Sequence, residues 1–280
     1  MKIWWSLLIV VGWVGVCAGG SATQPTADDG TVYLLKADQL AAGAHHEKHE
    51  ALFGRDVAGL NVLVLRAIDR VQAKFRDGGG YFIGVKAKPA ESPIGYELKL
   101  FDHNLLAPPR KTSYCSGSTY AALIETMNLV FREGGAMTAE RLDAIRMQEA
   151  DGSRREDHVK LWGHWNADGP GSQYALVQYS QMGEEIAPAH ARPGDFANIN
   201  WTNGGGHSVV FLGWVKDDAG NKSILYWASQ PRTNGLGDQQ TALNKIANIK
   251  FVRLTKPQNL FSFDPNANVK LKVQYDKIEW

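Results

Sequence analysis

Apolar residues follow a helical spacing in the first half of the chain. Residues 56–76 place apolar side chains three or four positions apart, from Val62 to Phe75. This spacing predicts an amphipathic helix that ends before three consecutive glycines. A buried helix is predicted over residues 118–132, and Thr138 is placed to cap a third helix.

The second half of the chain carries most of the strand signals. Alternating or continuous apolar runs predict strands at 81–85, 95–101, 195–201, 207–215, 222–229, 248–254 and 268–276. One more helix is expected at about 174–182. Because helices come first and most strands follow, the order favours an α+β fold.

The N-terminus has the pattern of an export signal. Lys2 precedes an uncharged stretch from Ile3 to Cys17, and small residues follow it. The stretch is short for a membrane span, so residues 1–22 are predicted to be a secretory signal peptide that is cleaved after Ala22. We therefore expect an exported protein, periplasmic or extracellular, with no stable membrane span.

A lipoprotein is the alternative reading of the same segment. Cys17 would then be the acylated residue, although Val16 stands where lipoprotein signals usually have a small residue. In either case residues 23–280 are expected to form one domain. A helical and loop insertion is expected at about 133–190, and the sequence does not fix the oligomeric state.

Composition narrows the class of protein further. The chain is 44% hydrophobic and 21% charged, which is typical of a globular domain rather than a disordered chain. Lys and Arg number 30 and Asp and Glu number 29, so there is no basic excess to indicate a nucleic-acid partner.

Cys115 is the only cysteine outside the predicted leader. An unpaired cysteine in an exported protein is either a small buried side chain or a reactive thiol. Cys115 lies where a Pro-rich loop enters the helix predicted near 118–132. A helix N-terminus stabilises a thiolate, and its backbone N–H groups can receive an oxyanion, so Cys115 is a candidate nucleophile.

His207 is the candidate base. It follows three glycines and opens an apolar strand, so the backbone before it can bend and approach another segment closely. A lone histidine can equally be a satisfied core residue. The glycine loop, the start of a strand and a single cysteine together favour a catalytic role.

These features resemble the NlpC-type cell-wall peptidases, which have a compact papain-like fold. The similar segments are Cys-Ser-Gly at the start of a helix (Cys115), Pro-Gly-Asp before a strand (193–195), and His207 with the apolar run behind it. Two features depart from the family pattern: Tyr114 precedes the nucleophile where Asp is frequent, and the segment between Cys115 and His207 is long.

The resemblance implies a papain-like cysteine hydrolase that cleaves amide bonds in peptidoglycan peptides, with no metal or organic cofactor. Cys115 would be the nucleophile and His207 the base. The residue that orients the histidine would lie on the next strand, where Gln230 and Ser229 fall on opposite faces. Gln230 is favoured because its amide oxygen accepts a hydrogen bond. Asp195 is a weaker candidate.

Two alternatives stay open. The scaffold could transfer the acyl group to an amine instead of water, or it could be a non-catalytic domain that binds the cell wall. Residues 160–169 carry tryptophans and amides that would suit either a substrate groove or a packed loop. The same segment includes His164, a rival base.

The histidines near residue 45 do not form a predicted metal site. His45 and His49 are four residues apart and would share one face of a helix, with His46 between them. No further ligand near them in the sequence completes a tetrahedral site, so no metal is expected.

Overall fold

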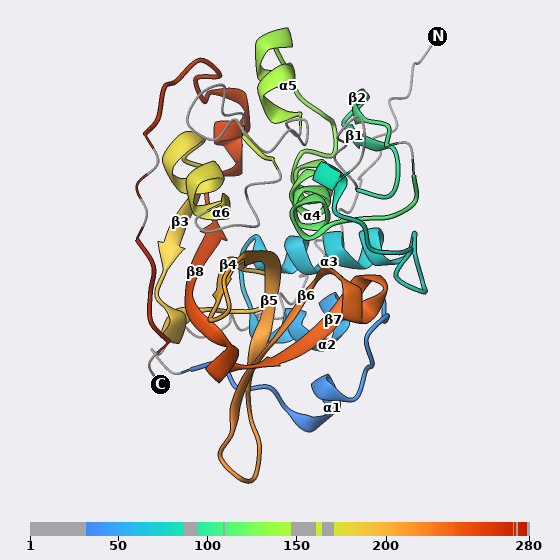
Figure 1. The fold of residues 1–280 in the computed structure, drawn as a ribbon. Coiled ribbons are helices and arrows are strands. Elements are labelled where there is room, and N and C mark those ends of the chain that lie inside the picture. Colours follow the sequence, from blue (N-terminus) through green and yellow to red (C-terminus); the bar gives the residue numbers. More distant parts are fainter. Residues whose placement is uncertain are drawn as a thin grey trace, which may run out of the picture.

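A computed structural model describes residues 32–86, 94–108, 110–146, 161–163, 171–270, 272 and 274–278. Its centre is a six-stranded sheet in the order β3-β8-β4-β5-β6-β7, in which every pair of neighbours is antiparallel (Figure 1). The strands are β3 (Gly183–Ile186), β4 (Phe196–Trp201), β5 (Gly206–Lys216), β6 (Lys222–Gln230), β7 (Gly235–Ala242) and β8 (Ile246–Leu254). A separate hairpin consists of β1 (Leu98–Leu100) and β2 (His103–Leu106).

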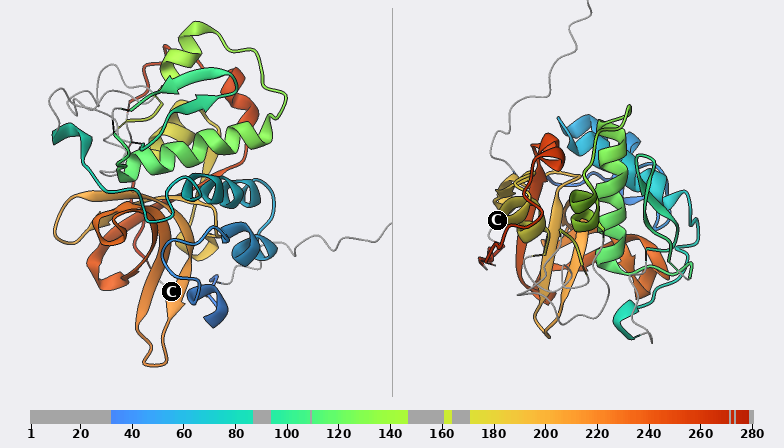
Figure 2. Two further views of the ribbon diagram at one scale, coloured as in Figure 1. Left: turned by 90° about the vertical axis from the view of Figure 1, so that its right-hand side faces the viewer. Right: turned by 90° about the horizontal axis from the view of Figure 1, so that it is seen from above.

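The long helices precede the sheet in the chain. The α-helices are α1 (Ala37–Leu40), α2 (His49–Phe53), α3 (Asn61–Gln72), α4 (Cys115–Val130), α5 (Ala139–Ile145) and α6 (Gly171–Gln173), the last continuing as a π-helical turn (Tyr174–Tyr179). Helices α3 and α4 lie side by side, and α4 contacts β5 and β6 (Figure 2). The predicted α+β class is therefore confirmed.

Both faces of the central sheet are buried. One apolar cluster joins α3 and α4 to sheet residues such as Val210 and Trp227. A second cluster includes Phe211 and Tyr226 and lies on the opposite face. Because alternate residues of β5 and β6 enter different clusters, these strands read as continuous apolar runs rather than as alternating ones.

The main helix and strand predictions are confirmed, with shifted ends. The helix predicted over 56–76 begins later, at Asn61, because Gly59 has a φ of +65° that no α-helix accommodates. Thr138 caps α5 as expected, since its Oγ1 accepts a hydrogen bond from the Arg141 N–H at 3.3 Å. Strands β4, β5, β6 and β8 lie where the sequence places them.

Other element predictions are wrong. Residues 81–85 form an isolated bridge at Tyr81 followed by a 3-10 turn. The described part of 268–276 contributes only a bridge between Asp276 and Ile249. Strands β3 and β7 were not expected. In the part of the chain described, no helix is both long and apolar enough to cross a membrane.

Candidate functional site

Cys115 is the first residue of α4, as predicted. The preceding Tyr114 is extended, and its side chain does not cap the helix. The Ser118 N–H donates to the Tyr114 carbonyl at 2.8 Å and closes the first turn. Cys115 is only 1% exposed, so any reaction of its thiol takes place in a largely water-excluded setting.

Hydroxyl groups fasten the first turn of α4 to the two strands that carry the other candidates. Thr119 Oγ1 lies 2.8 Å from Ser208 Oγ, and Ser208 directly follows His207. Ser118 Oγ accepts a hydrogen bond at 3.0 Å from the N–H of Ser229, which directly precedes the glutamine of the site. The helix start is thereby held against β5 and β6 beside both positions.

His207 and Gln230 are in direct contact. The two rest on neighbouring strands, and His207 Nε2 lies 3.3 Å from Gln230 Oε1. The amide nitrogen of Gln230 donates at 2.8 Å to the Gly237 carbonyl and at 2.8 Å to Thr233 Oγ1. A carbonyl can only accept, so Oε1 must face the histidine and His207 Nε2 must carry the proton. The free lone pair of neutral His207 is therefore on Nδ1.

Aromatic rings enclose this histidine. The ring of Tyr226 meets it edge to face at 5.4 Å between centroids, and the ring of Trp201 lies at 5.9 Å. Burial lowers the pKa of His207 to about 4, although the hydrogen bond with Gln230 acts in the opposite direction. His207 is consequently a neutral imidazole at pH 7, which is the protonation state that a general base requires.

Tyr226 lies on the same face of the sheet as His207 and Gln230. Burial raises the pKa of Tyr226 to about 12. The first turn of α4 is anchored one residue along each strand, at Ser208 beside His207 and at Ser229 beside Gln230.

The structure separates the two candidates for the orienting residue. Ser229 Oγ accepts a hydrogen bond from Ser113 Oγ at 2.7 Å, on the face of β6 that also carries Trp227. Gln230 points to the other face, where it meets His207. The expected alternation is therefore present. Ser229 holds the segment before α4, whereas Gln230 contacts the candidate base.

Asp195 has a different partner. It is fully buried and receives two hydrogen bonds from Arg253, each 2.8 Å long, one from the Asn61 amide and one from the Arg192 backbone N–H. These contacts tie the loop before β4 to β8 and α3. Asp195 is accordingly part of a buried ion pair, and its contacts give no support to a role beside His207.

The tryptophan-rich loop is described only in part. Trp162 is fully buried, and its indole N–H donates at 3.0 Å to the carbonyl of Ser116 in the first turn of α4. This residue is core, as the packed-loop reading expects. His164 and the rest of 164–170 lie outside the described residues, as do residues 1–31 with the predicted leader and Cys17.

A cleft of about 690 Å³ adjoins the approach to α4. Its walls include Lys74, Tyr96, Lys111 and Asn234. Lys111 lies four residues before Cys115, and Asn234 lies four residues after Gln230. Cys115, His207 and Gln230 do not line the cleft, and its walls carry the acidic side chains of Asp77 and Glu97 as well as cationic ones.

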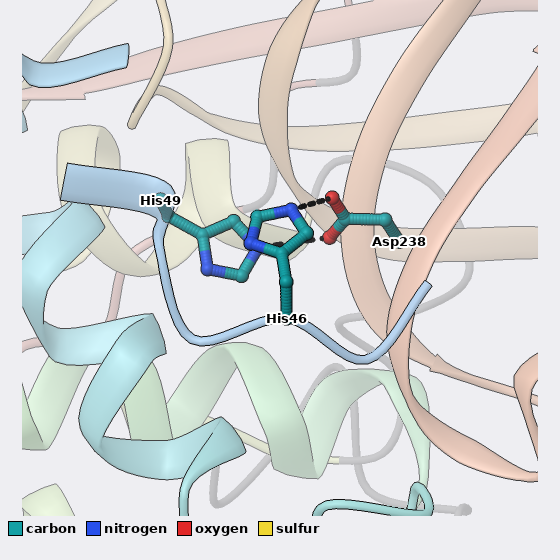
Figure 3. Close-up of side chains that lie close together, drawn as sticks. All are labelled: His46, His49 and Asp238. Atoms are coloured by element: carbon teal, nitrogen blue, oxygen red, sulfur yellow. Dashed lines mark hydrogen bonds and ion pairs between the residues drawn. The ribbon is translucent and has the colours of Figure 1, made fainter. Parts of the chain in front are cut away.

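A second cluster contains His46, His49 and Asp238 (Figure 3). His46 Nε2 lies 2.9 Å from Asp238 Oδ2, and His49 Nε2 lies 2.9 Å from Asp238 Oδ1. The other ring nitrogen of His49, Nδ1, lies 2.7 Å from Asp69 Oδ1. One imidazole is therefore held between two carboxylates.

Charge is concentrated and buried in this cluster. The side chain of His49 is completely buried, and those of His46 and Asp238 are 6% and 5% exposed. Burial lowers the pKa of His49, but the carboxylates of Asp238 and Asp69 outweigh burial and raise it to about 9. Burial raises the pKa of Asp238, and the two histidines bring it below its ordinary value.

The histidine geometry corrects the sequence-based prediction. His45 and His49 do not share a helix face, because α2 begins at His49 and His45 precedes it. His45 Nδ1 instead lies 3.0 Å from the carbonyl of Leu236. The sequence did not identify Asp238 and Asp69 as partners, because local spacing carries no signal for a contact between α2, α3 and β7.

Comparison with family models, with curated proteins and with solved structures finds no match for this chain.

Proposed function

We propose that this protein is an exported cysteine hydrolase that cleaves amide bonds, with peptidoglycan peptides as the substrate class. Cys115 is the nucleophile, His207 the base and Gln230 the residue that orients the base. The observation that carries the proposal is the hydrogen bond between His207 Nε2 and Gln230 Oε1 at 3.3 Å, beside the start of α4. It supports a papain-like arrangement of these residues.

The reaction divides into acylation and deacylation. His207 Nδ1 takes the proton from the Cys115 thiol as Sγ attacks the carbonyl carbon. The tetrahedral intermediate collapses, the C–N bond breaks, and His207 gives its proton to the leaving amine. A water molecule then attacks the thioester, again losing a proton to His207. The C–S bond breaks, the acid departs and the thiol is restored.

The helix start supplies the second element of the mechanism. The first N–H groups of α4 have no carbonyl partner within the helix, and the helix dipole places partial positive charge there. These groups would stabilise the oxyanion of the tetrahedral intermediate in a site that excludes water. Loss of one such donor typically costs about 100- to 1000-fold in kcat.

The substrate class rests on the predicted export and on the resemblance of the segments around Cys115 and His207 to cell-wall peptidases. Peptidoglycan stem peptides carry several carboxylates, and Lys111 offers a cation at the cleft wall. Lys111→Gln should therefore raise KM for such peptides and leave kcat nearly unchanged, because the side chain would bind the substrate without touching the reacting atoms.

The test is amide cleavage in purified peptidoglycan fragments, followed by mass spectrometry of the products. The wild-type protein should release a free carboxylate and a free amine, and Cys115→Ser should release neither while keeping the wild-type circular dichroism spectrum. Iodoacetamide should label Cys115 and stop turnover. A folded protein whose Cys115 cannot be alkylated at neutral pH would refute the proposal.

The same assay separates the alternatives. Added amines would divert the product from acid to amide if the protein were an acyltransferase. If it were a binding domain, Cys115→Ala would leave the affinity for peptidoglycan intact and no cleavage would occur in either form.

A further inference from the structure

We propose that His46, His49 and Asp238 bind one divalent transition-metal ion of the zinc class, at a site separate from Cys115. Two imidazole nitrogens and one carboxylate are a common set of three protein ligands for zinc, with the fourth position left to water. The three ligand atoms lie within 4.8 Å of one another. Both rings approach the same carboxylate (Figure 3).

The side chains must turn to hold an ion. Ligands about 2.1 Å from zinc in a tetrahedron lie about 3.4 Å from one another. The two nitrogen–oxygen distances in the cluster are each 2.9 Å, but they end on different oxygens of Asp238, and the two rings are stacked with centroids 4.2 Å apart. Metal binding therefore requires both Nε2 atoms to turn toward a common point beside one carboxylate oxygen.

Asp69 supplies the outer support that metal-binding histidines usually have. It accepts the Nδ1–H of His49 at 2.7 Å, which directs the lone pair of Nε2 toward Asp238. A lone pair on Nε2 and a carboxylate oxygen repel one another at 2.9 Å unless a cation lies between them. Either a proton or a metal ion can take that place, and carboxylate support of this kind favours metal binding.

Metal binding would break one hydrogen bond of His46. The Lys48 N–H donates to His46 Nδ1 at 3.1 Å, which places the proton of neutral His46 on Nε2. Metal binding through Nε2 moves this proton to Nδ1 and breaks that bond. Lys48 is exposed, so water replaces the lost partner of its N–H at little cost.

The bound ion would fix the chain against β7. The segment with His45 and His46 precedes α2 and lies along β7 at Leu236 and Asp238. Its binding should therefore be detectable without any measurement of catalysis.

The experiment is a titration of chelator-treated protein with Co²⁺, followed by visible absorption, with Zn²⁺ as competitor. The wild-type protein should bind one Co²⁺ per chain, give the bands of tetrahedral cobalt, and lose them on addition of Zn²⁺. His46→Gln, which changes the least buried of the ligand residues, should lose these bands. His45→Gln is the matched control and should keep them.

Asp69→Asn tests the outer support and should weaken Co²⁺ binding about 10- to 100-fold. Zn²⁺ should raise the melting temperature of the wild-type protein and of His45→Gln, but not that of His46→Gln. The proposal is overturned if the folded wild-type protein binds no Co²⁺, or if His46→Gln binds it as tightly as the wild-type protein does. Either result would mean that protons alone satisfy the cluster.

Discussion

The buried, neutral state of His207 should make the protein lose stability in mild acid. The histidine has a pKa of about 4 in the folded protein, against the ordinary value of 6.5. Between these two values the unfolded chain binds a proton at this position and the folded protein does not. Protons therefore favour the unfolded chain, and stability falls as the pH falls from 6.5 toward 4.

The size of the effect follows from the two pKa values. At pH 7 the difference in proton binding costs only a few tenths of a kcal/mol, whereas at pH 5 it costs about 2 kcal/mol. No reduction for solvent screening applies, since His207 is only 7% exposed. We expect the wild-type protein to lose about 2 kcal/mol more than His207→Gln between pH 7 and pH 5.

The assay is urea unfolding at pH 5, 6 and 7, with the free energy of unfolding compared between variants. His207→Gln has a constant offset from lost packing, so the slope with pH is the quantity that matters. His103→Gln removes an exposed histidine of β2 and should keep the wild-type slope. Equal slopes for the wild-type protein and His207→Gln would refute the argument that His207 is buried and neutral.

Three further predictions concern side chains around the site and the sheet. Gln230→Ala should lower kcat by about 100-fold or more, because the orientation of the base is lost. Ser229→Ala should lower the free energy of unfolding by only about 1 kcal/mol and leave kcat within a few-fold of the wild-type value. Steady-state kinetics compare the two variants, and equal losses of kcat would contradict the assignment. Arg253→Met should destabilise the protein by about 3–5 kcal/mol, because it leaves the buried carboxylate of Asp195 without a cationic partner. Urea unfolding measures this loss, and a value below about 1 kcal/mol would show that the hydrogen bonds from Asn61 and Arg192 stabilise the carboxylate without Arg253. Gly235→Ala should lower the melting temperature by several degrees. The φ of Gly235 is +111°, and the added carbon would collide with the carbonyl oxygens of Gly78 and Gly80. An unchanged melting temperature would contradict this close approach.

The positions of the candidate site residues were predictable from local pattern. A loop that enters a buried helix predicts the position of Cys115, and glycines before an apolar run predict that His207 opens a strand. Alternation along β6 places Ser229 and Gln230 on opposite faces. The choice between those two required the structure, because either side chain could accept a hydrogen bond from a histidine.

Strand β7 could not be predicted because its sequence is polar and contains glycine. Gly235 and Asp238 are buried on account of what packs against them, namely the glycine segment around Gly78 and the histidines before α2. An apolar pattern cannot report burial of this kind. The cluster of His46, His49 and Asp238 was missed for the same reason.

The hydrogen bonds that hold the segment before α2 against β7 should form late in folding. They join residues 189 to 192 positions apart in the chain. Closing a loop of that length costs entropy that local contacts do not, so these bonds form late. Gly237, whose carbonyl accepts a hydrogen bond from the amide of Gln230, lies between the two residues of β7 that contact this segment. A chain still being synthesised cannot hold Gln230 against His207 in this way until β7 has emerged, so the proposed catalytic geometry is among the last features to be completed.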